Sequence, residues 1–90
     1  MARAARNLHS DAYQSFLRRL RAAREAAHFT QTEVALRLGR PQSWVSKSEA
    51  GERRVDIVEL SELAAIYQRP LDYFVADLPP QRKRSASHKR

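Results

Sequence analysis

The 90-residue chain has no cysteine, only two glycines and no long apolar run, and each absence excludes a class of protein. Without cysteine there is no disulfide framework and no thiolate metal site, which fits a reducing compartment. No apolar run approaches the length of about 18 residues that a membrane-spanning helix needs. Residues 1–7 are basic without an apolar stretch behind them, so we expect no secretory signal. These features predict one small cytoplasmic domain without membrane association.

Charge is abundant, and its position along the chain says more than its total of +7. Residues 1–10 hold two basic residues and no acid, and residues 79–90 hold five basic residues and no acid. Between them, residues 11–54 hold nine basic and five acidic residues, whereas residues 55–78 hold one basic and five acidic residues. A polyanion such as nucleic acid is therefore expected to meet the first half of the folded part. A basic surface that is merely solvated is the alternative.

The spacing of apolar residues predicts an all-α domain over residues 10–78, with no strand. The expected helices cover residues 11–27, 31–38, 42–49, 57–67 and 71–75. Ser10 or Asp11 caps the first helix, and Thr30-Gln-Thr-Glu33 forms a capping box at the second. Asp56-Ile-Val-Glu59 resembles another such box, while Gly39 and Gly51 stand where helices end with positive φ.

The inward faces of these helices follow from three- and four-residue spacing. They comprise Tyr13, Phe16, Leu17, Leu20, Ala23, Ala27, Val34, Ala35, Leu38, Ile57, Leu60, Leu63, Ala64 and Tyr67. Residues 1–9 are predicted to form a flexible basic arm. Residues 79–90 lack large apolar side chains and are predicted to form a disordered basic tail. The tail is either an arm that contacts DNA or a solvated tail that aids solubility.

Residues 31–51 predict two short helices joined by a tight turn, an arrangement typical of a helix-turn-helix. An ordinary helical hairpin is the alternative from spacing alone. The second helix favours DNA, because its outward side chains are polar groups that suit base edges and phosphates. They are Gln42, Ser43, Ser46 and Lys47.

The segments Thr30-Gln-Thr-Glu-Val-Ala-Leu-Arg-Leu-Gly39 and Ser43-Trp-Val-Ser-Lys-Ser-Glu-Ala-Gly51 resemble the phage repressor/Cro-type helix-turn-helix family, also called the XRE family. The resemblance covers roughly residues 13–75 and implies a lambda-repressor-like fold of five helices that binds double-stranded DNA. It implies that Gln31 holds a phosphate and supports the start of the next helix. It also implies base contacts from Gln42, Ser43, Ser46 and Lys47, a groove-edge position for Arg40 and Pro41, and phosphate contacts from Arg53 and Arg54.

The resemblance also implies an ion pair between Arg24 and Glu49, and Arg24 does lie on the apolar stripe of its helix. Some positions depart from the family pattern. His28 and Gln68 stand where glycine is common, so we expect positive φ at some cost. Ser48 replaces a larger apolar residue, which predicts a polar or thinly packed spot. Trp44 is expected either to lie along the DNA backbone or to pack against residues 31–38.

The sequence favours a transcription regulator, a repressor that acts as a homodimer on a near-palindromic operator. The dimer surface is expected at Tyr73, Phe74, Val75 and Leu78, unless these residues only complete the core. The alternative is an antitoxin or adaptor of the same fold whose main partner is a protein. Three histidines far apart and no glycine-rich phosphate loop predict no metal site, no cofactor, no enzymatic activity and no small-molecule effector.

Overall fold

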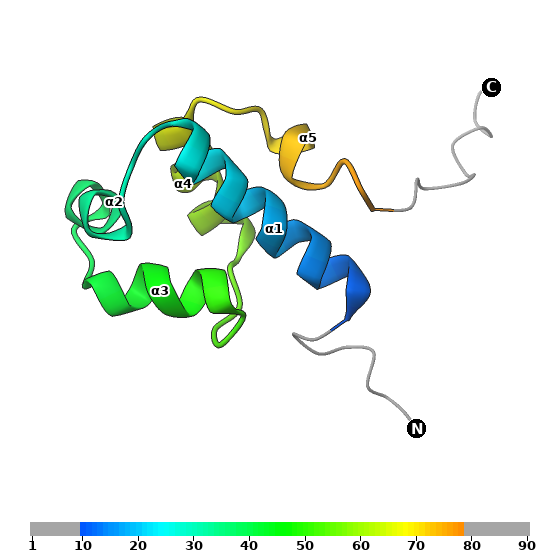
Figure 1. Cartoon of the computed structure of the whole chain (residues 1–90), viewed down its shortest axis with the longest axis horizontal. Helices are drawn as coiled ribbons and strands as arrows, with labels where there is room; N and C mark the ends of the chain where they lie inside the picture. The colour runs from blue at the N-terminus through cyan, green and yellow to red at the C-terminus, as the bar shows by residue number, and fades with distance from the viewer. Residues whose placement is uncertain (1–9, 79–90) are drawn as a thin grey trace.

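The computed structural model describes residues 10–78, which contain five helices and no strand (Figure 1). The helices are α1 (Asp11–Ala26), α2 (Gln31–Leu38), α3 (Gln42–Ala50), α4 (Ile57–Tyr67) and α5 (Leu71–Phe74). The predicted all-α class is confirmed, with α1 and α5 each one residue shorter than expected and α3 one residue longer. The proposed arm (1–9) and tail (79–90) lie outside the described residues.

Three of the helices begin with a side-chain cap. Ser10, rather than Asp11, caps α1 by accepting a hydrogen bond from the Tyr13 amide at 3.1 Å. Both capping boxes are present, with Thr30 and Glu33 at α2 and Asp56 with its partner glutamate at α4. Each box satisfies two amides that the first turn of a helix leaves without an intrahelical partner. Local sequence therefore fixes where these helices start.

Three of the five helices, α2, α3 and α4, end on a residue with left-handed backbone. Gly39 and Gly51 end α2 and α3 with φ of 70° and 80°. Gln68 ends α4 at φ 59°, and His28, two residues after α1, has φ 64°. The prediction of positive φ at His28 and Gln68 is thereby confirmed. Glycine adopts this conformation without a Cβ penalty, whereas the other two residues adopt it at a cost.

The core lies where α1, α2, α3, α4 and α5 meet. Its buried apolar residues are Phe16, Leu17, Leu20, Ala23, Val34, Ala35, Val45, Leu60, Leu63, Ala64, Tyr67 and Phe74. One expectation was wrong: Ile57, which helical spacing placed on the inward face of α4, is 65% exposed. Ile57 is the first residue of α4, and among residues 10–78 no element covers most of its side chain.

The arrangement of α2 and α3 matters most for function. Figure 1 shows α2 nearly end-on and α3 lengthwise, so the two helices cross steeply after the turn at residues 39–41. Helix α1 packs against α3 and α5, and the Arg19 guanidinium on α1 holds both carboxylate oxygens of Asp77 at 2.9 and 3.0 Å. Within the described residues, each helix is too short or too polar to cross a membrane.

Candidate functional site

Helix α3 presents a polar face to solvent. Gln42, Ser43 and Lys47 are exposed and Ser46 is half-buried, while the opposite face is buried through Val45. All four predicted base-contacting side chains therefore lie on the accessible part of one short helix. Its first residue, Gln42, follows the N-cap Pro41, whose backbone is extended at φ −67° and ψ 152°.

Three hydrogen-bonded side chains tie the start of α3 to the interior. Gln42 Nε2 donates to Gln31 Oε1 at 2.8 Å, and Gln31 Nε2 donates to Glu49 Oε1 at 3.0 Å. Gln31 opens α2, so this chain bridges both helices of the helix-turn-helix pair. The hydrogen bond between Gln31 and Gln42 is a contact through which Gln31 can support the start of α3, as predicted. The phosphate contact of Gln31 stays a prediction.

Arg24 and Glu49 form the expected ion pair. Arg24 Nε and Nη2 lie 2.6 and 3.0 Å from the two Glu49 carboxylate oxygens, and Nη1 donates to the Phe29 carbonyl at 2.9 Å. The side chain of Glu49 is 2% exposed and that of Arg24 is 12% exposed. The hydrogen bond to Glu49 raises the pKa of Arg24 above its usual value. Both charges are thus held deep in the fold, where each depends on the other.

Trp44 packs against the hydrophobic core, and its predicted place along the DNA backbone or against α2 stays a prediction. Two guanidinium groups lie over its half-buried ring, that of Arg40 at 4.4 Å and that of Arg53 at 4.5 Å from the ring centroid. Arg40 also approaches the Glu62 carboxylate at 3.8 Å. Trp44 therefore holds the turn before α3 and the turn after it against one another.

Arg53 has internal partners that sequence reasoning missed. Its guanidinium donates to Ser48 Oγ at 3.0 Å and to both Glu59 carboxylate oxygens at 3.2 and 3.0 Å. This contact holds the pKa of Glu59 below its usual value, since the cation favours the ionised carboxylate. Arg53 thus joins the end of α3 to α4, and its predicted phosphate contact would have to compete with Glu59. Arg54 is exposed and lies 5.2 Å from the centroid of the Tyr13 ring.

The buried Ser48 is a polar spot, as predicted, and it is well satisfied. It is 1% exposed, donates to the Trp44 carbonyl at 2.7 Å and accepts from Arg53. The spacing of Ser48 and Arg53 gave no signal of this contact. It depends on how the chain turns after Gly51.

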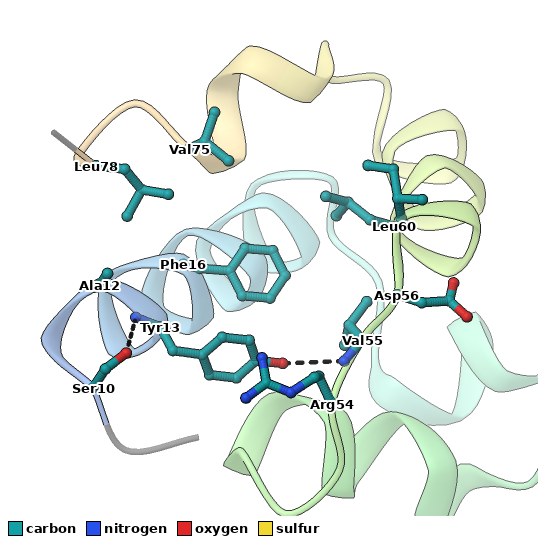
Figure 2. Close-up of a pocket in the computed structure, with 11 residues that line it drawn as sticks. Ser10, Ala12, Tyr13, Phe16, Arg54, Val55, Asp56, Leu60, Val75 and Leu78 are labelled. Carbon is teal, nitrogen blue, oxygen red and sulfur yellow. Dashed lines mark hydrogen bonds between the residues drawn. The ribbon is translucent and has the colours of Figure 1, made fainter. Parts of the chain in front are cut away.

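An apolar groove of about 450 Å³ lies on a different part of the molecule (Figure 2). Its apolar lining includes Tyr13, Phe16, Ile57, Leu60, Val75 and Leu78. The Tyr13 hydroxyl accepts from the Val55 amide at 3.1 Å along one wall, as Figure 2 shows. The groove therefore combines the start of α1, the start of α4 and the chain after α5.

The four residues of the predicted dimer surface have different environments. Phe74 is fully buried in the core, so its side chain is not available to a partner. Tyr73 is half-buried, with the guanidiniums of Arg19 and Arg69 at 5.0 and 5.1 Å from its ring centroid. Val75 is 44% exposed, and together with Leu78 it lines the apolar groove.

Comparison with known families matches residues 15–73, more than half of the chain, to a helix-turn-helix domain. The chain belongs to this helix-turn-helix family. The matched range contains α2, α3 and most of the contacts described above. Membership indicates a DNA-binding protein and agrees with the accessible polar face of α3. Comparisons with curated proteins and with solved structures give no significant match.

Proposed function

We propose that the protein is a sequence-specific regulator of transcription of the phage repressor/Cro type, which binds double-stranded DNA. One observation carries the proposal: the polar side chains of α3 are accessible while its buried residues anchor the helix in the core. In helix-turn-helix proteins the second helix enters the major groove, and glutamine, serine and lysine bond base edges there. The proposed base contacts come from Gln42, Ser43, Ser46 and Lys47.

We further propose a homodimer that acts as a repressor on a near-palindromic operator. One small domain buries little DNA surface, so two copies on half-sites about 34 Å apart give tighter binding. The apolar groove, whose lining includes the exposed Ile57 and Val75, is the surface proposed for the second copy. Occupancy of the operator would exclude RNA polymerase. This role needs no cofactor and no catalytic group.

The decisive experiment is a binding selection from random DNA duplexes with the full chain, repeated with Gln42→Ala and Lys47→Ala. We expect the wild-type protein to enrich one sequence. Each substitution is expected to cost about 1–3 kcal/mol if it removes a base contact, and to relax the preference at particular base pairs. Glu52→Ala, which alters an exposed residue beyond the end of α3, is the matched control. Enrichment of no sequence by the wild-type protein would refute the proposal.

A further inference from the structure

Two carboxylates of α4 face the two arginines that lie over the Trp44 ring. Arg53 donates to both oxygens of Glu59 at 3.2 and 3.0 Å, and Arg40 Nη2 lies 3.8 Å from Glu62 Oε1. Glu59 and Glu62 are three residues apart, so they project from the same side of α4. The cluster therefore holds two cations and two anions, and the arginines that the family resemblance places at DNA are neutralised within the chain.

The two ion pairs differ in how firmly they are held. Arg53 also donates to Ser48 Oγ at 3.0 Å, and the side chain of its partner Glu59 is 14% exposed. The side chains of Arg40 and Glu62 are 34% and 46% exposed, and their distance of 3.8 Å is too long for a hydrogen bond. An exposed, loose ion pair contributes little to stability. Arg40 can therefore leave its carboxylate at small cost, whereas Arg53 would lose three hydrogen bonds.

The Trp44 ring holds Arg40 in place when the ion pair opens. The guanidinium lies 4.4 Å from the ring centroid, and this contact does not depend on Glu62. Arg40 directly precedes Pro41 and Gln42, at the start of the proposed base-reading helix α3. With α3 in the major groove, the turn before it comes close to the phosphates at the groove edge. A guanidinium binds phosphate and carboxylate with the same charge-assisted hydrogen bonds.

We infer that Glu62 occupies, in the free protein, the place that a DNA phosphate takes on Arg40 in the complex. On binding, Arg40 exchanges the carboxylate for the phosphate, while Arg53 stays on Glu59 and contacts no phosphate. Glu62 is thus an internal competitor that limits the affinity for every duplex, whatever its sequence. The inference rests on the proposed function, because the exchange requires α3 to dock on DNA.

A double-mutant cycle tests the exchange, with Kd measured on a selected duplex and on one of unrelated sequence. Glu62→Gln removes the competing charge and should tighten binding to both duplexes about two- to fivefold, the range of an exposed ion pair. In an Arg40→Gln background it should change Kd no more than Glu52→Gln does, a variant that removes an exposed carboxylate beyond the end of α3. Equal tightening with and without Arg40, or no tightening in the wild-type background, would overturn the inference.

The salt dependence of binding distinguishes the two arginines. Each phosphate contact contributes about 0.9 to the slope of log K against log salt concentration. Arg40→Gln should lower the slope by about this amount, whereas Arg53→Gln should leave the slope unchanged and lower the melting midpoint, because it removes three hydrogen bonds. An unchanged slope in Arg40→Gln, or a lower one in Arg53→Gln, would overturn the assignment.

The failure of this inference is distinguishable from failure of the proposed function. Native melting midpoints for Glu62→Gln and Arg40→Gln show that a change in Kd does not come from unfolding. A wild-type protein that selects no sequence refutes the proposed function. Intact selection with additive effects of the two substitutions refutes the exchange alone.

Discussion

The carboxylate of Glu49, on α3, accepts hydrogen bonds from side chains of α1 and α2. Arg24 contributes two hydrogen bonds and Gln31 one. Arg21 Nε lies 3.7 Å from Glu49 Oε1, the oxygen that also accepts from Gln31. Replacing a buried partner leaves the remaining charge without compensation, which costs roughly 3–5 kcal/mol. We therefore expect Glu49→Ala to lower the free energy of unfolding by that amount, measured by chemical denaturation. Glu52→Ala, at an exposed glutamate, should change it little, and an unchanged value for Glu49→Ala would contradict a stabilising role for the pair.

Tyr67 is the second residue whose burial predicts a measurable effect. Its hydroxyl is buried without a hydrogen-bond partner among residues 10–78. Leaving such a group unsatisfied is costly, so Tyr67→Phe should raise the free energy of unfolding by about 1 kcal/mol near neutral pH.

Burial also raises the pKa of the Tyr67 phenol well above its usual value, with a smaller contribution from Glu49. The folded state then holds this proton more tightly than the unfolded state, where the pKa is about 10. Stability should accordingly fall as pH rises above about 10, and Tyr67→Phe should weaken this fall. Denaturation at pH 8 and pH 11 measures both effects. A destabilised variant would contradict an unsatisfied hydroxyl, and an unchanged dependence of stability on alkaline pH would contradict the raised pKa.

At the scale of the elements, the sequence predicted the positions of the helices better than the contacts between them. Ser or Thr caps, capping boxes and glycine ends act within a few residues, so helix positions followed from the sequence to within one residue. The exposure of Ile57 and the contacts of Arg53 depend on which elements pack nearby, and spacing along one helix carries no such information. The Arg24–Glu49 pair was predicted from the family resemblance, aided by the odd position of a charge on an apolar stripe.

Substitutions at the ends of α2 and α4 are expected to change the free energy of unfolding in opposite directions. Both helices end on a left-handed residue, Gly39 at φ 70° and Gln68 at φ 59°. A Cβ at Gly39 would meet no atom within 4 Å, so Gly39→Ala should cost only the backbone strain, about 1 kcal/mol. Gln68→Gly should relieve similar strain and raise the free energy of unfolding by up to about 1 kcal/mol. Thermal and chemical unfolding of both variants test this, and loss of stability in Gln68→Gly would mean that its side chain contributes more than the strain costs.

The whole molecule divides its charge and its apolar surface between different regions. The accessible face of α3 lies in the basic part of the chain, residues 11–54, while α4 and α5 lie in the acidic part, residues 55–78. The apolar groove draws on both parts, from the start of α1 to Val75 and Leu78 (Figure 2). If α3 meets DNA, the groove can accept a second copy without covering Gln42, Ser43, Ser46 or Lys47, although Arg54, a predicted phosphate contact, also lines it.

A charge placed in the groove tests the proposed dimer. Val75 is 44% exposed and lines the groove, so Val75→Asp should leave the fold intact but place a carboxylate in an apolar contact. We expect the wild-type protein to sediment as a dimer and the variant to shift toward the monomer by at least tenfold in dissociation constant. Leu36→Asp introduces the same charge at an apolar side chain of α2 that is 77% exposed and lies outside the groove, and it should leave the dimer unchanged.

On DNA, Val75→Asp should weaken binding to a two-site operator far more than to a single half-site, because only the former requires both copies. Equal loss on both duplexes, or a wild-type protein that stays monomeric with and without DNA, would contradict the groove as the dimer surface.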